Sequence, residues 1–506
     1  MYFTELLKTI DPLKVCGDTA IEIQELYHDS RQVQSGGLFF ALRGSAADGH
    51  RFIEMAVRNG AAAVVAEDAA TVPAGIPYAK VADARRAMSV MAARFYGNPT
   101  DGLSLIGITG TNGKTTTSYI IEAILEEAGI PTALLGTISY RFRDWVLPAP
   151  HTTPESIDLQ KCLREMVDRG ARGVVMEVSS HALEQHRVDG CRFDVGVFTN
   201  LTRDHLDYHG DMDAYLASKM RLFSEHLAAD SVKPGRLAAV NMDDPYGPRI
   251  ASGAVSPVIS YGLGADSQVS ARDAQFSVSG ITGLLVTPAG EAPFRSRLPG
   301  RFNLYNILAA TAAGVALGLP LAAICRGIEK HKKVPGRLEM VDNNRDIALF
   351  VDYAHTGDAL ENVLRTLQEL KTGRIITLFG CGGDRDRGKR PVMGEVAGRF
   401  SDLAVITSDN PRTERPSVIM AEIKSGIQPL GTREYGVEEL SGGFAEKGFV
   451  LVESRRQAIR LAVRLAGPGD IVLLAGKGHE VYQIFGTEKF HFDDREEAGA
   501  ALKDEG

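Results

Sequence analysis

The sequence lacks the cysteine patterns that mark disulfide frameworks and zinc sites. Its 506 residues include five cysteines, and no two of them are spaced as Cys-x-x-C. An odd number of scattered cysteines is typical of reduced thiols in the cytosol, because a disulfide framework uses its cysteines in pairs. We therefore expect a cytoplasmic protein without a structural disulfide or zinc ion.

The sequence also lacks an excess of basic residues. Its 56 lysines and arginines are outnumbered by 64 aspartates and glutamates, which gives a net charge of −8. A nucleic-acid-binding protein normally carries a basic stripe, so we expect no nucleic-acid partner. A local pocket can still be positive on an acidic protein, and an anionic small-molecule ligand is compatible with this charge.

No segment has the pattern of a secretion signal or a clear membrane span. The first residues, MYFTELLKTIDPLK, do not combine a basic start with an apolar run. The uncharged stretch Ile307–Ile324 covers 18 residues, which is near the lower limit for a membrane helix. Because Gly318-Leu319-Pro320 interrupts it, we interpret the stretch as two packed helices joined by a turn.

Length and composition predict about three globular domains. At roughly 150 residues per domain, 506 residues are too many for one core. Turn-forming residues suggest boundaries near Gly97-Asn98-Pro99 and at Val334-Pro335-Gly336. We predict a small N-terminal domain over residues 1–98, a central domain over residues 99–336 and a C-terminal domain over residues 337–506.

Strands and helices alternate along each predicted domain. In the first domain, a helix over Arg51–Asn59 separates the strands Gly37–Leu42 and Ala61–Ala66. The central domain has a helix over Thr115–Ala128 and strands at 103–108, 173–178 and 194–199. The C-terminal strands are predicted at 347–351, 374–379, 403–407, 449–452 and 471–474. This pattern predicts an α/β protein with a mostly parallel central sheet and a Rossmann-like, doubly wound C-terminal sheet, whose ligands bind at the carboxyl ends of its strands.

A glycine-rich segment follows the first strand of the central domain. Gly110, Thr111, Asn112 and Gly113 precede Lys114, Thr115 and Thr116, which open a helix. Glycines let backbone N–H groups approach phosphate oxygens, Lys114 can bridge the β- and γ-phosphates, and the Thr115 hydroxyl can bind Mg²⁺. The strict P-loop pattern has glycine where this chain has Ile108. We therefore predict a variant ATP-binding loop; the alternative is an ordinary strand–helix turn rich in small residues.

This loop resembles that of the Mur ligases, which carry T-G-T-N-G-K-[ST], and the resemblance continues through all three predicted domains. It implies a monomeric, cytoplasmic, ATP-dependent ligase of peptidoglycan precursor synthesis. The implied reaction adds meso-diaminopimelate to UDP-N-acetylmuramoyl-L-Ala-D-Glu. An acyl phosphate would form first and the amino group would then attack it, giving an amide, ADP and phosphate.

The resemblance also implies catalytic and metal-binding residues. Glu177 stands in Met-Glu-Val-Ser-Ser-His at the end of one predicted strand, and His205 stands in Asp-His-Leu-Asp-Tyr-His after another. With Thr115 they are implied as Mg²⁺ ligands. Lys219 is implied to be carbamylated by CO₂ and to hold a second Mg²⁺, with Lys114 beside the phosphates. From the residues alone, His205 fits a packing or surface histidine and Lys219 an exposed helical lysine.

For the nucleotide, the resemblance implies contacts from Asn303, Asn306, Arg337, Asp352 and His355. The family usually has proline two residues after this histidine, where the chain has Gly357. That change loosens the loop and removes no functional group.

The nucleotide-sugar peptide is implied to bind in two places. The uridine site would include His28, Ser30, Ser45, Ala46 and Ala47, although the two serines could instead be simple loop or cap residues. The muramoyl-peptide site would include Thr152, Thr153, Ser179, Gln185 and Arg187. His151 stands where the family often has asparagine, and we assign it no role.

The implied amino-acid pocket centres on Asp409-Asn410-Pro411-Arg412. An arginine fork binds a carboxylate with two hydrogen bonds, and diaminopimelate has a distal carboxylate that lysine lacks. The resemblance assigns Arg412 to this carboxylate and Glu480 to the distal ammonium, with Arg385 and Gly476 nearby. From the residues alone, Arg412 could be a surface arginine in a turn.

Two kinds of alternative stay open. The first is a related ligase that adds lysine, D-Ala-D-Ala or glutamate to folate; Arg412 and the first-domain segment His28-Asp29-Ser30-Arg31 discriminate against these. The second is a P-loop switch or regulatory ATPase that forms no amide. The metal-site pattern and the C-terminal pocket favour the ligase.

Overall fold

The computed structural model describes residues 1–44 and 47–504 of the chain. The chain forms two compact units. The first contains residues 1–272, 285–292 and 305–328, and the second contains residues 273–284, 293–304 and 329 onward.

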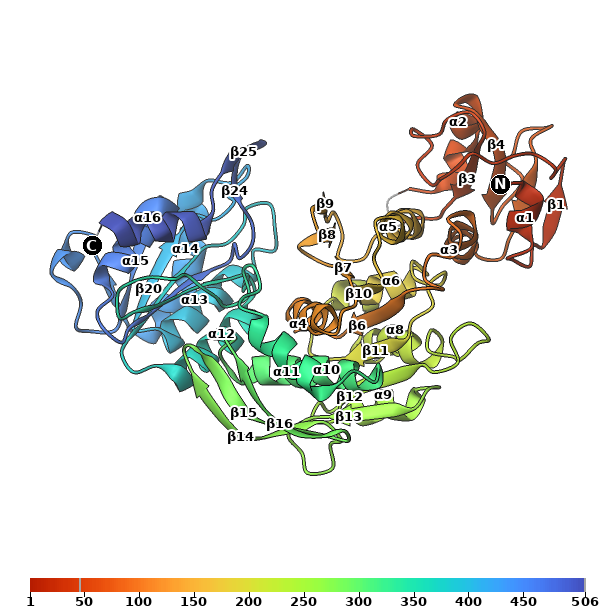
Figure 1. Ribbon diagram of the computed structural model, residues 1–506. Coiled ribbons are helices and arrows are strands. Elements are labelled where there is room, and N and C mark those ends of the chain that lie inside the picture. The colour runs from red at the N-terminus through yellow and green to blue at the C-terminus, as the bar shows by residue number, and fades with distance from the viewer. Residues whose placement is uncertain (45–46, 505–506) are drawn as a thin grey trace. The chain divides into compact units, whose positions relative to one another are not determined.

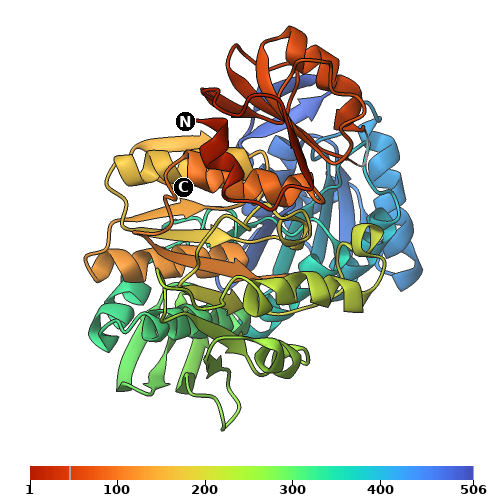
Figure 2. The same ribbon diagram turned by 90° about the vertical axis from the view of Figure 1, so that its right-hand side faces the viewer.

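The N-terminal part of the first unit is built on a five-stranded sheet in the order β1-β5-β4-β3-β2. The sheet is parallel except for β1. Figures 1 and 2 draw this N-terminal part of the chain in red to orange. Its elements are α1 (Phe3–Leu7), β1 (Lys14–Cys16), β2 (Glu25–Tyr27), β3 (Gly37–Ala41), α2 (Ile53–Arg58), β4 (Ala61–Ala66), β5 (Tyr78–Lys80) and α3 (Ala84–Phe95). Leu38 and Phe40 pack against α3 on one face, and Phe39 packs against α2 on the other.

The central part of the first unit is an eight-stranded sheet in the order β13-β12-β11-β6-β10-β7-β8-β9. The strands from β13 to β7 are parallel, and β8 and β9 continue the sheet as an antiparallel hairpin. The strands are β6 (Ser104–Thr109), β7 (Thr132–Leu135), β8 (Ser139–Phe142), β9 (Trp145–Pro148), β10 (Gly173–Glu177), β11 (Val195–Phe198), β12 (Leu237–Asn241) and β13 (Val258–Tyr261). The mostly parallel central sheet predicted from the sequence is confirmed.

Helices connect these strands, as the parallel arrangement requires. They are α4 (Lys114–Glu127), α5 (Ser156–Asp168), α6 (Ser180–Glu184), α7 (Leu206–His209), α8 (Met212–Ser224) and α9 (Gly247–Gly253). Helix α4 begins after Gly113 and ends before Gly129, both with positive φ. Ile120, Ile121 and Ile124 are buried on it, as predicted.

A further three-stranded sheet consists of β14 (Ser270–Ser277), β15 (Gly280–Thr287) and β16 (Gly290–Ser296).

The long uncharged stretch forms two helices, α10 (Arg301–Ala316) and α11 (Leu321–Lys330), as predicted. Gly318 has a φ of +67° in the turn between them. Helix α11 packs so closely on α4 that a Cβ atom added at Gly327 would lie 2.5 Å from the Ile124 Cα atom. Among the described residues, no helix is both long enough and apolar enough to cross a membrane.

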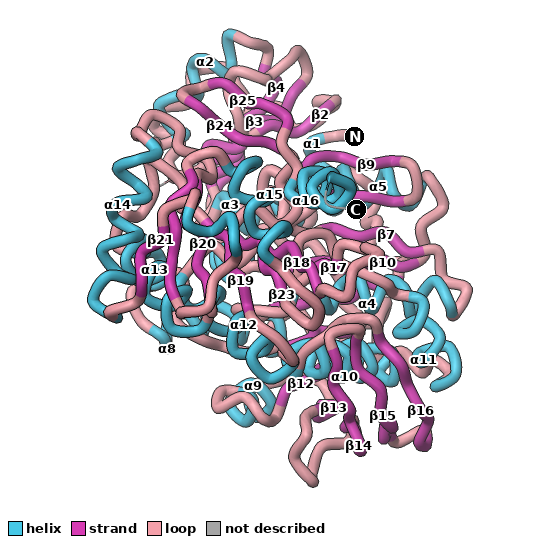
Figure 3. Tube along the Cα trace, turned by 90° about the vertical axis from the view of Figure 1, so that its left-hand side faces the viewer, coloured by secondary structure: helices cyan, strands magenta, loops and turns pink. Residues whose placement is uncertain are grey.

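The second unit contains a seven-stranded sheet in the order β17-β18-β23-β19-β20-β22-β21 (Figure 3). All neighbouring strands are parallel except β17 and β18. The strands are β17 (Glu339–Met340), β18 (Ala348–Asp352), β19 (Ile375–Phe379), β20 (Leu403–Thr407), β21 (Arg433–Tyr435), β22 (Gly448–Val452) and β23 (Ile471–Ala475), and a separate hairpin pairs β24 (Tyr482–Phe485) with β25 (Glu488–His491).

Helices cover both faces of this sheet, which confirms the doubly wound fold. One face packs against α12 (Gly357–Leu370), α13 (Lys389–Phe400) and α14 (Pro416–Ile427). The other face packs against α15 (Arg455–Leu465) and α16 (Asp494–Asp504). Because β18, β23, β19 and β20 are adjacent and parallel, the loops after them meet at one edge of the sheet.

Candidate active site

The glycine-rich loop joins β6 to α4 and is held by the loop that follows β11. The N–H groups of Thr111 and Asn112 donate to the backbone and side-chain oxygens of Asn200 at 2.8 and 2.9 Å. Gly110 has a φ of +145°, and a Cβ atom there would clash with the Thr199 hydroxyl. The backbone conformation of this loop therefore depends on glycine.

Two lysines share one acceptor in this loop. Lys114 Nζ donates to the carbonyl oxygens of Gly110 and Thr111, both at 2.9 Å. Lys219 Nζ, from helix α8, donates to the same Gly110 oxygen at 3.0 Å. The structure thus brings the predicted residues Lys114 and Lys219 together, although they are distant in the sequence.

Lys219 is buried, with 1% of its surface exposed, so the interpretation as an exposed helical lysine is wrong. Its Nζ lies 4.5 Å from the ring centre of Tyr215, and it has no ion-pair partner among the described residues. Burial, reinforced by the Lys114 ammonium, holds the pKa of Lys219 well below its usual range. The side chain is therefore biased toward the neutral, nucleophilic amine.

Glu177 ends strand β10 and is also buried. Its carboxylate accepts hydrogen bonds from the Thr115 hydroxyl at 3.1 Å, the Thr137 hydroxyl at 3.0 Å and the Thr137 N–H at 2.9 Å. Neighbouring ligands of an octahedral Mg²⁺ lie about 2.9 Å apart, so Thr115 Oγ1 and Glu177 Oε2 fit two positions around one ion. Thr137 was not predicted, because it lies on a loop without any recognisable motif.

No described contact joins His205 to Thr115 or Glu177. It is exposed, has a φ of +53°, and places its ring 5.0 Å from that of His181. No group of three His, Cys, Asp or Glu side chains in the described parts of the chain is arranged to hold a metal ion. The structure therefore joins Thr115 to Glu177, whereas the metal-binding role of His205 stays a prediction.

Four of the five residues predicted for the muramoyl peptide form one hydrogen-bonded group. Thr153 Oγ1 donates to the Glu177 carbonyl at 2.8 Å and accepts from the Ser179 N–H at 3.1 Å. Arg187 donates to the Thr153 carbonyl at 2.9 Å and to Gln185 Oε1 at 2.7 Å. The fifth residue, Thr152, shares a hydrogen bond with Thr137.

Glu155 completes this group and was not predicted. It lies 2.8 Å from Arg187 Nη2 and 3.7 Å from Arg85 Nη1, between two guanidinium groups. A single glutamate before a helix gave no sign of this position in the sequence.

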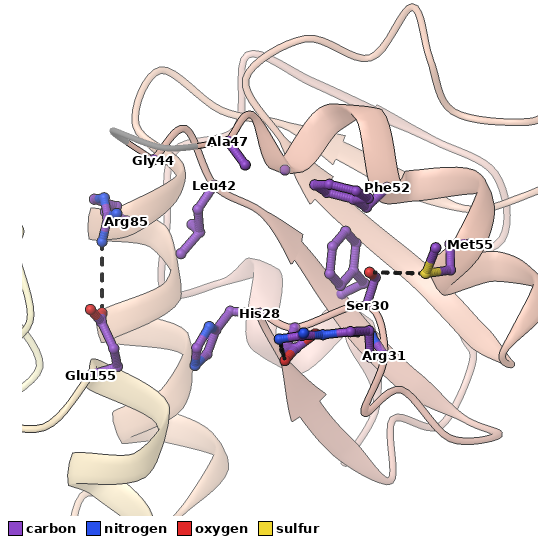
Figure 4. Close-up of a pocket in the computed structure, with 13 residues that line it drawn as sticks. His28, Ser30, Arg31, Leu42, Gly44, Ala47, Phe52, Met55, Arg85 and Glu155 are labelled. Carbon is purple, nitrogen blue, oxygen red and sulfur yellow. Dashed lines mark hydrogen bonds and ion pairs between the residues drawn. The ribbon is translucent and has the colours of Figure 1, made fainter. Parts of the chain in front are cut away.

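A cavity of about 560 Å³ opens in the N-terminal part beside His28, Ser30 and Ala47 (Figure 4). Ser30 is buried, and its hydroxyl lies 3.4 Å from Met55 Sδ. The Asp158 carboxylate, 4.0 Å from His28 Nε2, raises the pKa of His28. The other two residues predicted here, Ser45 and Ala46, lie outside the described residues. Phe52, Met55 and Arg85 also line the cavity and were not predicted.

The two predicted asparagines lie on helix α10. Asn306 accepts a hydrogen bond from Thr117 at 3.3 Å, and a Cβ atom at Gly113 would clash with its Oδ1 atom. Asn306 is therefore packed directly on the glycine-rich loop. Asn303 is buried and donates to the Pro299 carbonyl at 2.8 Å.

In the second unit, Arg337, Asp352 and His355 are brought together at the end of β18. Asp352 is buried, and its two oxygens accept from the Leu338 and Ala354 N–H groups at 2.6 and 2.7 Å. Arg337 and His355 both lie against the ring of Tyr353. Asp352 thus holds the backbone next to Arg337 and next to His355. Its contact with the nucleotide stays a prediction.

The predicted amino-acid pocket forms where β19, β20 and β23 end. Asn410 links its two sides: its Nδ2 donates to Glu480 Oε2 at 3.0 Å, and its Oδ1 accepts from the Ile484 N–H at 3.1 Å. Arg412 Nη1 donates to the Gly383 carbonyl at 2.8 Å. Within the described residues its Nε and Nη2 atoms make no hydrogen bond, which leaves one edge of the guanidinium for a ligand.

The other predicted pocket residues lie around these side chains. A Cβ atom at Gly382 would lie 2.9 Å from Arg412 Nη1 and 3.7 Å from Arg385 Cγ, so both arginines flank this glycine. Gly476 follows β23 and donates its N–H to the Asp352 carbonyl at 3.0 Å. Asp409 and Pro411 are buried beside Asn410.

Lys477 lies fully buried beneath this pocket and was not predicted. Its Nζ lies 3.2 Å from Asp409 Oδ1, 3.3 Å from Asn410 Oδ1 and 3.8 Å from Glu480 Oε2. Burial and the nearby Asp409 carboxylate raise the pKa of Glu480, and Lys477 opposes this effect. The pocket thus contains the Arg412 guanidinium and the Glu480 carboxylate, and both make hydrogen bonds with Asn410 or its neighbouring loop.

The fold agrees with the family comparisons. Three family models match consecutive segments: Mur ligase family, catalytic domain, at residues 22–96; Mur ligase middle domain at 108–314; and Mur ligase, glutamate ligase domain, at 336–478. The chain belongs to the Mur ligase family, and the predicted three-domain α/β architecture is confirmed.

The chain is also similar to individual relatives over almost its full length. The chain is 67% identical to the UDP-N-acetylmuramoyl-L-alanyl-D-glutamate–2,6-diaminopimelate ligase of Geobacter metallireducens, over 100% of this chain and 99% of the relative. It is 46% identical to the enzyme of the same name from Geobacillus kaustophilus, over 96% of both chains. A solved structure of a ligase with this name is similar with a TM-score of 0.73 and 33% identity, covering 100% of this chain and 99% of that one.

Proposed function

We propose that this chain is an ATP-dependent ligase that joins meso-diaminopimelate to UDP-N-acetylmuramoyl-L-Ala-D-Glu, forming ADP and phosphate. The observation that carries the proposal is the pocket at Arg412, Asn410 and Glu480, read with the family membership. Arg412 presents a free guanidinium edge for a carboxylate, and Glu480 presents a carboxylate for an ammonium. Diaminopimelate carries both groups at its distal end.

In the proposed reaction, the D-glutamyl carboxylate attacks the γ-phosphate of ATP, the bond between the γ-phosphorus and the bridging oxygen breaks, and an acyl phosphate forms as ADP leaves. Lys114 stabilises the charge on the phosphates, because it lies at the start of α4 beside the glycine-rich loop. The amino group of diaminopimelate then attacks the acyl carbonyl, and phosphate leaves. Thr153, Ser179, Gln185 and Arg187 hold the peptide, since their hydrogen-bonded group adjoins Glu177.

Mg²⁺ would supply charge neutralisation for the phosphates when bound. Thr115, Glu177 and His205 are the proposed ligands of one ion. Lys219 is proposed to become a carbamate that holds a second ion. The neutral amine adds to the carbon of CO₂, a nitrogen–carbon bond forms, and one proton passes to solvent. The low pKa of Lys219 supports this step, because only the neutral amine is nucleophilic.

The remaining assignments follow the same proposal. Asn303 and Asn306 of α10, with Arg337, Asp352 and His355, are proposed to bind ATP. The cavity beside His28, Ser30 and Ala47 is proposed to hold the uridine, together with Ser45 and Ala46. We propose that residues 1–98, 99–336 and 337–506 act as the three functional domains of a cytoplasmic monomer.

Product formation tests the proposal directly. Purified protein is mixed with UDP-N-acetylmuramoyl-L-Ala-D-Glu, ATP, Mg²⁺ and one amino acid, and ADP and the tripeptide product are measured. We expect both products with meso-diaminopimelate and far less with L-lysine or D-Ala-D-Ala. Absence of ADP with meso-diaminopimelate would contradict the function, whereas equal rates with L-lysine would contradict only the assignment of Arg412.

A further inference from the structure

We infer that Glu414 is a positioning residue for the amino-acid pocket: it ties the loop that carries Arg412 to the loop that carries Arg385. This inference rests on the proposed function for the identity of the ligand. Glu414 stands outside the predicted pocket residues, two positions after Arg412.

Glu414 makes hydrogen bonds with both of its carboxylate oxygens. Oε1 accepts from the Asp384 N–H at 2.6 Å and from Arg390 Nη2 at 2.7 Å. Oε2 accepts from Arg390 Nη1 at 2.9 Å. Arg390 is a fully buried residue of α13 that also donates to the Gly382 carbonyl at 3.2 Å. One carboxylate therefore connects a rigid helix to two separate loops.

The two loops hold backbone conformations that need such support. Asp384 and Arg412 both have a φ of +52°, a conformation that non-glycine residues rarely adopt. The loops also bind each other directly: Gly383 N–H donates to the Asn410 carbonyl at 2.9 Å, and Thr413 Oγ1 donates to Asp384 Oδ1 at 2.7 Å. A small shift of either loop would move the arginine that it carries.

The charge of Glu414 is required for this role. The hydrogen bonds from Arg390 and from the Asp384 N–H lower the pKa of Glu414 to about 2, so the carboxylate is ionised at neutral pH. A glutamine has the same shape but only one acceptor oxygen. Its NH₂ group would face a guanidinium or an N–H group, and at least one of the present hydrogen bonds would be lost.

Glu422 provides a matched control within the same ion-pair group. It lies on α14 and accepts from Arg390 Nη1 at 2.7 Å, much as Glu414 does. It also pairs with Arg387, at the end of the loop that carries Arg385. Within the described residues it makes no hydrogen bond with residues 382–385 or 409–413. Glu422→Gln therefore weakens the pairing of Arg390 and of Arg387 but keeps the hydrogen bond from the Asp384 N–H to Glu414.

The test measures steady-state KM values of Glu414→Gln, Glu422→Gln and the unmodified full chain for each of the three substrates. We expect Glu414→Gln to raise the KM for meso-diaminopimelate about tenfold or more. The KM values for ATP and for the UDP-dipeptide should change less than about twofold. Glu422→Gln should leave all three within about threefold. An equal rise for all substrates, no rise at all, or the same profile in both variants would overturn the inference.

Amide hydrogen exchange separates this inference from the proposed function. In the protein without substrates, Glu414→Gln should speed exchange at the Gly383 and Asp384 N–H groups, and Glu422→Gln should not. If the unmodified chain forms no product with meso-diaminopimelate, the proposed function fails while the exchange result still decides whether Glu414 holds the loops. Unchanged exchange in Glu414→Gln would count against the inference whatever the substrate is.

Discussion

Two buried lysines, one in each unit, have opposite electrostatic surroundings. Lys219 is 1% exposed, donates to the Gly110 carbonyl and lies near the Lys114 ammonium. Lys477 is fully buried and lies between the carboxylates of Asp409 and Glu480. A buried charge is costly unless it is paired. Lys219 has no carboxylate partner among the described residues, whereas Lys477 has two.

This difference suits Lys219 to a chemical reaction and Lys477 to holding neighbouring side chains in place. A neutral amine can form a new covalent bond, which is what the proposed carbamate requires of Lys219. A paired ammonium is held in place and holds its partners in turn, which suits Lys477 beneath the amino-acid pocket. If the comparison is right, removing Lys219 should abolish turnover with little loss of stability. Removing Lys477 should mainly lower the stability of the fold.

The largest expected effect is on turnover in Lys219→Ala. We expect kcat to fall about 100-fold or more, because the variant cannot supply the proposed anion beside the phosphates. The melting temperature should fall modestly, since no carboxylate is left unpaired. Added formate or acetate should restore part of the activity by entering the cavity. Lys219→Met is the control: it fills the cavity and should not be rescued. Turnover like that of the unmodified chain in Lys219→Ala would rule out the carbamate.

The burial of Lys219 has a signal in the sequence, in the spacing of its helix neighbours. Tyr215, Lys219 and Leu222 recur at helical spacing on α8, and all three are buried. A lysine in an apolar stripe of a helix therefore points inward, contrary to the default for lysine. The glycine-rich loop was recognisable because its glycines, its lysine and the following helix are contiguous in the sequence.

Other features depend on contacts that the sequence does not display. The strands Ala61–Ala66 and Leu403–Thr407 were predicted with their observed ends, because they are apolar runs bounded by turn residues. The short edge strands β17 and β21 were missed, since two or three residues carry no clear period. Thr137 and Lys477 were missed as well, because each reaches its partners only through the tertiary fold.

The next expected effect is on stability in Lys477→Met. Removing the ammonium leaves the Asp409 and Glu480 carboxylates buried together, which should lower the free energy of unfolding by about 3–5 kcal/mol. Chemical denaturation measures this change, and Lys489→Met on the exposed strand β25 is the control, with an expected change under about 0.5 kcal/mol. Equal losses in the Lys477 and Lys219 variants would remove the contrast between the two sites.

A smaller effect is expected for Arg412→Ala, which tests how the amino-acid pocket above Lys477 binds its ligand. Loss of a charge-assisted contact should cost about 1.5–3 kcal/mol in the binding of meso-diaminopimelate. The KM for meso-diaminopimelate should therefore rise about tenfold to 100-fold, with that for ATP nearly unchanged. An equal rise for both substrates would mean that Arg412 acts elsewhere than in the amino-acid pocket.

The smallest effect is expected for Gly382→Ala, which perturbs the pocket without removing any charge. The added Cβ atom would lie 2.9 Å from Arg412 Nη1, at the far end of a flexible side chain that can move by a few tenths of an ångström. We expect the KM for meso-diaminopimelate to rise about twofold to fivefold while stability changes by less than about 1 kcal/mol. Gly442→Ala, at a position in the same unit where no atom lies within 4 Å, is the matched control and should leave the KM unchanged. Arg390 and Glu414 hold the backbone of both loops through their hydrogen bonds. If Gly382→Ala leaves the KM for meso-diaminopimelate unchanged, the Arg412 guanidinium moves more freely than its hydrogen bond to the Gly383 carbonyl implies.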